Sequence, residues 1–257
     1  MLLCLDVGNT HIHGGVFADS EELQLQFRYP SNGPLSSDVF GLFVTGVLRE
    51  NDLDPQAIQA VAMSSVVPSI DYSIKSACKK YFGLMPLEIK AGVKTGLNIR
   101  VKQPARVGAD RIATAAAAVE AYPGQNIIVV DFGTATTVCA ITESKNYLGG
   151  AIMLGIQSSM NALYQAASQL MPVGIVKPES ALGVTTEGNI QSGLYHSQLG
   201  GVKHLIENYQ ETVFNGKKPV VVATGGYAYL FEGDGLYDAF DPYMVLRGLR
   251  AIWFRNR

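Results

Sequence analysis

The chain has 257 residues, of which 47% are hydrophobic and 16% are charged. Disordered chains show the reverse balance, and this length suits one large domain or two ordinary ones. With 20 basic and 22 acidic residues the net charge is −2, so the strongly basic surface of a duplex-DNA-binding protein is not expected. Gly, Ser or Asp interrupts every apolar run well before the roughly 20 residues that span a bilayer. We therefore expect no nucleic-acid partner and no membrane span.

The three cysteines, at positions 4, 78 and 139, include no Cys-x-x-Cys pair. An odd number without that spacing argues against both a disulfide framework and a zinc knuckle. The first residues lead directly to Asp6 and lack the basic and apolar regions of a secretory signal. Together these features predict a reduced, cytoplasmic location.

The first half of the chain begins with a predicted strand–turn–strand hairpin over residues 2–17. Helical spacing of apolar residues follows at 35–50 and 69–82, and a buried strand is predicted between them at 61–67. Residues 110–122 read DRIATAAAAVEAY, an alanine-rich run that predicts a helix beginning at Asp110.

The second half opens on another predicted hairpin, over residues 127–141. The run GGAIMLGI at 149–156 is expected to lead into a helix that extends to about residue 170. A long helix at 188–213, a strand at 220–226 that ends in a glycine-rich turn, and an amphipathic helix at 242–254 complete the predicted elements.

The two hairpins form an approximate internal repeat. Each contains a strand followed by Asp-x-Gly and a second strand, and the aspartates, Asp6 and Asp131, lie 125 residues apart, about half the chain. One such hairpin could arise by chance, whereas two at this spacing indicate a duplicated α/β domain. The sequence thus predicts an N-terminal domain over 1–115 and a C-terminal domain over 116–257.

Both turns have a composition that suits phosphate binding. Glycine and small hydroxylic residues bring several backbone N–H groups together, and an aspartate beside them makes sense if it holds a cation that neutralises phosphate charge. The alternative is an ordinary hairpin in which the aspartate hydrogen-bonds its own backbone. Neither a P-loop motif nor a G-x-G-x-x-G motif after a strand is present, so a P-loop kinase and a Rossmann dinucleotide site are disfavoured.

The segment Gly108-Ala109-Asp110-Arg111 has two interpretations. Asp110 is a good residue to cap the helix that it begins. The start of a helix is also a place where a carboxylate can accept a proton from a substrate hydroxyl, with Arg111 supplying a cation for an acidic substrate.

Seven short motifs can be recognised along the chain. They are Asp6-Val7-Gly8-Asn9-Thr10, Gly108-Ala109-Asp110-Arg111, Asp131-Phe132-Gly133-Thr134-Ala135-Thr136-Thr137, Gly149-Gly150-Ala151-Ile152, Thr186 with Gln191-Ser192-Gly193, Ala223-Thr224-Gly225-Gly226, and Asp241-Pro242 with Leu246-Arg247-Gly248-Leu249. In this order and spacing the set resembles the type III pantothenate kinases over essentially the whole chain.

The resemblance implies an α/β fold with two ribonuclease-H-like halves and a nucleotide cleft between them. This is the fold of the acetate and sugar kinase, chaperone ATPase and actin superfamily, and it agrees with the internal repeat. The implied reaction is the ATP-dependent phosphorylation of the pantothenate 4′-hydroxyl, the first step of coenzyme A synthesis. The implied cofactors are ATP with Mg²⁺ and a monovalent cation, K⁺ or NH₄⁺.

The resemblance also implies roles for nucleotide-binding residues. Asp6 is expected near the Mg²⁺-bound phosphates, Thr134 matches a second nucleotide contact, and Asp131 matches the ligand of the monovalent cation. The first phosphate loop is matched by Asp6, Val7, Gly8, Asn9, Thr10, His11, Ile12 and His13.

On the substrate side, Asp110 matches the general base, and Gly108, Ala109, Asp110 and Arg111 match the pantothenate-binding segment. Thr186 matches a further pantothenate contact, which family members supply across a homodimer interface. The chain departs from the family pattern at Val101, where a Tyr is common, at Leu154, where a Pro is expected, and at Val184-Thr185, which replaces a Lys-Asn pair.

Two other functions remain open at this point. One is a non-catalytic accessory protein of the same family that binds a nucleotide or a partner without transferring phosphate. The other is a kinase or phosphohydrolase of the same fold that acts on a different small molecule. The presence of Asp110, Asp131 and Thr134 favours the enzyme, and the Gly108–Arg111 segment favours pantothenate.

Overall fold

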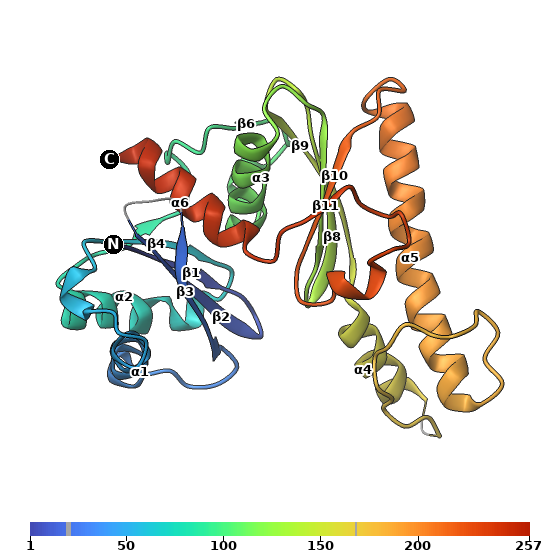
Figure 1. Ribbon diagram of the computed structural model, residues 1–257, viewed down its shortest axis with the longest axis horizontal. Helices are drawn as coiled ribbons and strands as arrows, with labels where there is room; N and C mark the ends of the chain where they lie inside the picture. The colour runs from blue at the N-terminus through green and yellow to red at the C-terminus, as the bar shows by residue number, and fades with distance from the viewer. Residues whose placement is uncertain (19–21, 168) are drawn as a thin grey trace. The chain divides into compact units, whose positions relative to one another are not determined.

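The computed structural model describes residues 1–18, 22–167 and 169–257 (Figure 1). It contains two compact units, each built around one β-sheet. Unit 1 comprises residues 1–97, 102–120 and 244–257, and unit 2 comprises residues 98–101 and 121–243. The predicted domains, 1–115 and 116–257, follow the internal repeat and remain a prediction.

Unit 1 contains a five-stranded sheet in the order β3-β2-β1-β4-β5. The first three strands are antiparallel neighbours, whereas β4 is parallel to β1 and β5 is parallel to β4. The strands are β1 (Leu2–Val7), β2 (His11–Phe17), β3 (Leu23–Pro30), β4 (Ala60–Ser65) and β5 (Leu87–Glu88).

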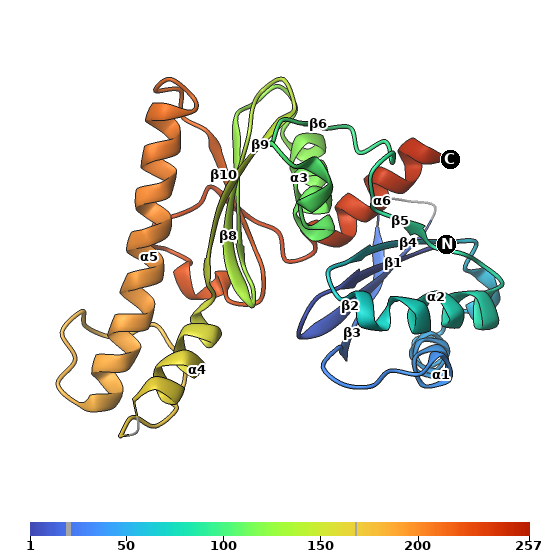
Figure 2. The same cartoon turned by 180° about the vertical axis from the view of Figure 1, so that it is seen from behind.

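Helices cover both faces of this sheet (Figures 1 and 2). The bounds of the helices are α1 (Ser37–Arg49), α2 (Pro68–Phe82), α3 (Ala109–Ala121) and α6 (Met244–Asn256), with short 3-10 turns at Pro55–Ala57 and Pro104–Arg106. Helices α1 and α2 pack on the face that carries Leu3 and Leu5. The C-terminal helix α6 packs on the other face, where its Leu246 lies against Gly15.

Local sequence explains where these helices begin and end. The Ser36 hydroxyl caps α1 by accepting a hydrogen bond from the Val39 N–H. Pro68 starts α2, and Gly83 ends it in the left-handed conformation that glycine adopts without strain. The alanine-rich run forms α3, most of which is buried.

Unit 2 contains a six-stranded sheet in the order β11-β10-β7-β8-β9-β6. Its strands are β6 (Asn98–Ile99), β7 (Ile127–Phe132), β8 (Ala135–Ile141), β9 (Asn146–Leu154), β10 (Val220–Thr224) and β11 (Ala239–Phe240). Helices α4 (Ile156–Ala166) and α5 (Thr186–Thr212) pack together, and a 3-10 turn spans Ala228–Phe231.

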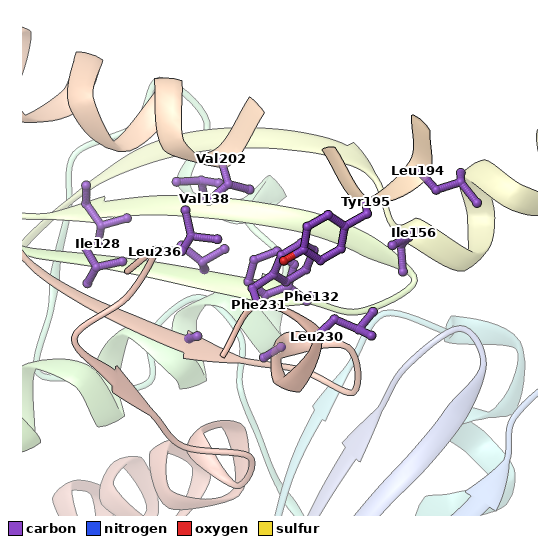
Figure 3. Packing of buried hydrophobic residues seen from close by; sticks show 14 of the residues in the cluster. Ile128, Phe132, Val138, Ile156, Leu194, Tyr195, Val202, Leu230, Phe231 and Leu236 are labelled. Atoms are coloured by element: carbon purple, nitrogen blue, oxygen red, sulfur yellow. The ribbon is translucent and has the colours of Figure 1, made fainter. Parts of the chain in front are cut away.

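The core of unit 2 lies between its sheet and α5 (Figure 3). Phe231 stacks on Phe132 with ring centroids 4.6 Å apart, and on Tyr195 of α5 with centroids 5.2 Å apart. Stacked aromatic rings bury a large apolar area and add a geometric preference of their own. Phe132 is the last residue of β7, so this packing anchors the strand immediately before the second turn.

The two sheets repeat one topology. The order and strand directions of β9-β8-β7-β10-β11 match those of β3-β2-β1-β4-β5, and β6 is an added edge strand. Strands β1 and β7 even share one burial pattern, in which only the aspartate near the end is partly exposed. The duplicated α/β domain predicted from the two hairpins is therefore confirmed.

Most predicted elements are present, with two differences. Residues 149–154, which were expected only to lead into a helix, form the end of strand β9, which pairs with β8 through Gly150 and Ile152. The helix that follows begins at Ile156, close to the expected place, but ends at Ala166 rather than near residue 170. Strand β3 was not predicted.

The structure also bears on the cysteines and on the expected absence of a membrane span. Cys4, Cys78 and Cys139 are buried as thiols, and none forms a disulfide. Among the described residues, no helix is both long enough and apolar enough to cross a membrane.

Candidate active site

The first candidate turn joins β1 to β2 and is anchored by Asp6. The Ser64 hydroxyl of β4 donates a hydrogen bond of 2.7 Å to Asp6 Oδ1. This contact follows from strand register, because Asp6 lies directly opposite Ser64 across the parallel pair β1·β4. Ser64 is fully buried, so the Asp6 carboxylate is held by a hydroxyl that solvent does not reach.

Residues of the turn itself are exposed. The Gly8 N–H donates to the His11 carbonyl (3.0 Å), and the side chains of Asn9, Thr10 and His11 are open to solvent. Val7 and Ile12 are fully buried in the core of unit 1. Their side chains therefore support the hairpin, and any part that they take in phosphate binding would come from their backbone.

His13 is buried, with 7% of its surface exposed. It stands opposite Asp6 across the antiparallel pair β1·β2, and its Nε2–H donates to Gln26 Oε1 (3.3 Å). Burial, helped by the nearby charge of Arg28, lowers the pKa of His13 from 6.5 to about 4, although the Gln26 bond opposes the change. The imidazole is therefore neutral at pH 7.

The second candidate turn joins β7 to β8 through Gly133 and Thr134. Asp131 occupies the same place in β7 that Asp6 occupies in β1, and its neighbour across the parallel pair is Thr224 of β10. The next residue, Gly225, has φ +91°, and a Cβ there would lie 2.4 Å from Asp131 Oδ1. Gly225 is thus required both by its backbone conformation and by the closeness of the carboxylate.

Asp110 is the second residue of α3, one position later in the helix than predicted. Its Oδ1 accepts a hydrogen bond from the Arg111 N–H (2.8 Å), and Gly108 stands so close that a Cβ there would lie 2.4 Å from Oδ1. Of the residues that the structure describes, none donates a hydrogen bond to Oδ2. The carboxylate is thus oriented through one oxygen, and the other oxygen can accept a proton.

Thr186 is exposed at the start of α5. The preceding Thr185 caps that helix, since its hydroxyl accepts a hydrogen bond from the Gly188 N–H (3.0 Å). Asn, the residue that the family resemblance led us to expect at position 185, and Thr are both common helix N-caps. Val184 is 91% exposed and takes no part in the cap.

The two other departures also lie in unit 2. Val101 packs against Gly149, where a Cβ would come within 3.3 Å of Val101 Cγ1. Leu154 exposes its side chain at the end of β9, while its carbonyl accepts a hydrogen bond from Gln198 Nε2 (2.7 Å). The Leu154 bond is made by the backbone, so a different side chain at this position is compatible with the strand.

The candidate residues thus fall into two groups. Residues 6–13 and 108–111 belong to unit 1, whereas Asp131, Thr134 and Thr186 belong to unit 2. Ser64 was missed by the sequence analysis. Nothing in its local sequence shows that it faces a carboxylate 58 positions away, since that contact depends on the register of two strands.

The Asp6 carboxylate is a suitable ligand for a metal ion that binds together with a nucleotide. In residues 1–18, 22–167 and 169–257, no group of three or more His, Cys, Asp or Glu side chains could hold a metal ion. Mg²⁺ is commonly bound by one or two carboxylates together with substrate phosphates and water. A single carboxylate beside a phosphate-sized turn, as at Asp6, fits a magnesium–nucleotide complex better than a resident metal centre.

The fold is shared with a known sugar kinase. The crystal structure of the ROK hexokinase from Thermus thermophilus superimposes with a TM-score of 0.52 and 13% identity, covering 100% of this chain and 99% of that one. This likeness shows a shared fold, which agrees with the two-sheet α/β architecture that the sequence resemblance implied.

Sequence comparison is more specific. A protein from Legionella pneumophila (strain Corby) is 52% identical over 256 residues, covering 100% of this chain and 99% of its own length, and is named type III pantothenate kinase. A protein from Francisella tularensis subsp. holarctica (strain OSU18), named type III pantothenate kinase 1, is 49% identical over 257 residues and 100% of both chains.

The family model described as type III pantothenate kinase matches residues 2–208, a range that contains every candidate residue of both groups. These matches favour the kinase over the accessory-protein interpretation. By its family model and its full-length relatives, the chain belongs to the type III pantothenate kinase family.

Proposed function

We propose that the chain transfers the γ-phosphoryl group of ATP to the 4′-hydroxyl of pantothenate. The observation that carries this proposal is the match to full-length relatives of about 50% identity that bear the name of this kinase. In the reaction, the substrate hydroxyl oxygen bonds to the γ-phosphorus, the bond from that phosphorus to the β,γ-bridging oxygen breaks, and ADP leaves. The hydroxyl proton passes to a base.

Asp110 is the proposed base. Phosphoryl transfer depends mainly on positioning and charge neutralisation, with one carboxylate to orient the attacking hydroxyl. The Arg111 N–H holds Asp110 Oδ1, which leaves Oδ2 to accept the proton. Gly108, Ala109 and Arg111 would form the adjoining pantothenate site, and the Arg111 guanidinium suits the pantothenate carboxylate.

The nucleotide is assigned to the two turns. Residues 6–13 of unit 1 form the proposed first phosphate loop, with exposed Asn9, Thr10 and His11 as its polar side chains. Thr134, exposed in the turn of unit 2, is the proposed second contact. Bound Mg²⁺ would supply positive charge to the phosphates, and Asp6 is the carboxylate placed to hold it or its water shell.

Asp131 is the proposed ligand of K⁺ or NH₄⁺. It is partly exposed at the end of β7, beside the backbone of Gly225. A partly exposed carboxylate can bind a monovalent cation, and such a cation would offset phosphate charge beside the second turn.

We also propose a homodimer in which Thr186 contacts pantothenate bound to the partner subunit. Unit 2 exposes several large apolar side chains that a partner could cover, namely Ile152, Leu154, Met171, Leu182 and Val184. Light scattering should then give about twice the chain mass. A monomer that is fully active would refute the role of Thr186 across an interface. A cytoplasmic location, proposed from the cysteine content and the amino-terminal sequence, is consistent with three buried thiols.

The test is pantothenate-dependent release of ADP by the purified protein, with Mg-ATP at millimolar concentration. We expect turnover that requires pantothenate and rises when K⁺ or NH₄⁺ is added. Turnover without cation dependence would keep the kinase and refute the role of Asp131. A protein that binds ATP but releases no ADP would contradict the proposed reaction.

A further inference from the structure

The segment that follows the third strand of unit 1 is bonded to the first turn. Ser31 comes directly after β3 and is buried. Its N–H donates to the Thr10 carbonyl (3.1 Å), and its hydroxyl donates to the Gly8 carbonyl (2.5 Å). One residue therefore holds both the first and the last residue of the turn Gly8–Thr10.

The same arrangement recurs in unit 2. Gly155 comes directly after β9, and its N–H donates to the Thr134 carbonyl (3.1 Å). Ser158, in the first turn of α4, donates its hydroxyl to the same carbonyl (2.6 Å). In both units, then, one backbone N–H and one serine hydroxyl after the third strand hold carbonyls of the turn between the first two strands.

These bonds determine the direction of the turn's N–H groups. A trans peptide is planar, so its C=O and N–H point in opposite directions. Because Ser31 holds the Gly8 carbonyl, the Asn9 N–H of the same peptide is directed away from Ser31. The Thr134 carbonyl likewise fixes the peptide that carries the Ala135 N–H. A turn whose peptides are fixed before the ligand arrives loses less conformational freedom on binding.

We propose that Ser31 and Ser158 are equivalent positioning residues for phosphate binding, each holding one phosphate turn through its hydroxyl. The inference rests on the proposed nucleotide-binding role of the two turns. It assigns neither serine a contact with the nucleotide, since each acts through a carbonyl of the turn. It also predicts a specific signature, because loss of either hydroxyl should weaken nucleotide binding and leave pantothenate binding unchanged.

The experiment measures the binding of ADP, with Mg²⁺ present, by calorimetry for the whole chain and for Ser31→Ala and Ser158→Ala. Each variant loses one neutral hydrogen bond, so we expect the dissociation constant to rise about 5-fold. The KM for ATP should rise by a similar factor while the KM for pantothenate stays within about 2-fold of the parent value. Ser158→Thr keeps the hydroxyl and should bind ADP as the parent does.

Ser159→Ala is the matched control, since Ser159 is the next residue of α4 and its N–H, which alanine keeps, donates to the Gly155 carbonyl rather than to a carbonyl of the turn. It should bind ADP as the parent does. The inference is overturned if both Ser31→Ala and Ser158→Ala bind ADP with the parent affinity, or if Ser159→Ala weakens binding equally. A parent chain that bound no ADP would instead refute the proposed function, so the two failures are distinguishable.

Discussion

The turn of unit 1 spans three residues, Gly8 to Thr10, whereas the turn of unit 2 spans two, Gly133 and Thr134. Both follow a strand whose last residue but one is an aspartate, and both are held by a serine hydroxyl from the segment after the third strand. The backbone arrangement has thus been kept in the two halves, although the length and the residues of the turn differ.

The surroundings of the two aspartates differ more. Asp6 has the buried His13 on one side and the hydrogen-bonded Ser64 on the other. Asp131 has Thr137 and Thr224 at the matching positions. A titratable group therefore neighbours the first carboxylate, while two threonines neighbour the second. The two aspartates thus have the same backbone position but different neighbouring side chains. This difference agrees with the proposal that Asp6 binds Mg²⁺ and Asp131 binds K⁺ or NH₄⁺.

The largest effect is expected from a residue that lies outside both hairpins. Asp110→Asn should lower kcat at least about 100-fold, because the amide cannot accept the hydroxyl proton. Binding of ADP with Mg²⁺ should change less than about 3-fold, since the turns are unaltered. Single-turnover kinetics and calorimetry measure the two quantities. A variant with near-normal turnover would show that Asp110 serves only the first turn of α3, through its bond to the Arg111 N–H.

The second-largest effect is a difference in stability between alanine variants at glycines beside the two turns. A Cβ on Gly155 would lie 2.2 Å from the Gly133 carbonyl oxygen, whereas a Cβ on Gly8 would lie 3.2 Å from the His11 carbonyl oxygen. Gly155→Ala should therefore lower the free energy of unfolding by about 2 kcal/mol, and Gly8→Ala by less than about 1 kcal/mol. Urea denaturation provides the measurement. Equal losses in the two variants would contradict the difference in packing.

His13, the residue opposite Asp6, should make the stability of unit 1 depend on pH. The folded pKa of His13 is about 4, below its usual 6.5, so the unfolded chain binds more protons between these values. This contribution to stability is complete above about pH 6.5 and is lost as the pH falls towards about 4. Between pH 7 and pH 5 we expect it to cost about 1–2 kcal/mol.

His13→Thr tests this contribution by introducing the residue type found at the matching position, Thr137. The variant should lose less free energy of unfolding than the parent when the pH is lowered from 7 to 5. Urea denaturation at both values gives the difference, in which the other titrating groups cancel. Parallel losses in the two proteins would show that His13 is protonated in the folded chain as easily as in the unfolded chain.

The smallest effect is expected at Ser64. Ser64→Ala removes one hydrogen bond from Asp6 and should raise the Mg²⁺ concentration required for half-maximal activity about 5-fold. Ser64→Thr restores a hydroxyl and imitates Thr224 of the second half, so it should lie closer to the parent. Activity measured against Mg²⁺ concentration decides this. An alanine variant with parental Mg²⁺ dependence would show that Asp6 is positioned without Ser64.

Much of the fold could be predicted because its signals are local. The two hairpins, the alanine-rich α3 and the long α5 all show their period and composition within one stretch of sequence. Strand β3 was missed although it too carries a local signal, the alternation of apolar and polar residues that is typical of a half-buried strand. Strand β9 was obscured by Gly149-Gly150 in its middle, a pair that suggests a break in a strand.

The candidate site was predicted in a different way. Asp6, Asp110 and Asp131 came from motifs that resemble a family, and such motifs mark residues at turns and helix starts. The serines that hold Asp6 and the carbonyls of the two turns did not come from these motifs. Ser31, Ser64 and Ser158 act across 23, 58 and 24 positions of sequence, so only the register of strands and the path after β3 and β9 bring them to their partners.

Helix α6, the last element of the chain, belongs to the first unit and covers the face of its sheet that α1 and α2 leave open. During synthesis this helix emerges from the ribosome only after unit 2. Domains usually fold in the order in which they are made, but unit 1 cannot complete its core until all of unit 2 has been translated. One apolar face of its sheet therefore stays uncovered while residues 121–243 of unit 2 are synthesised.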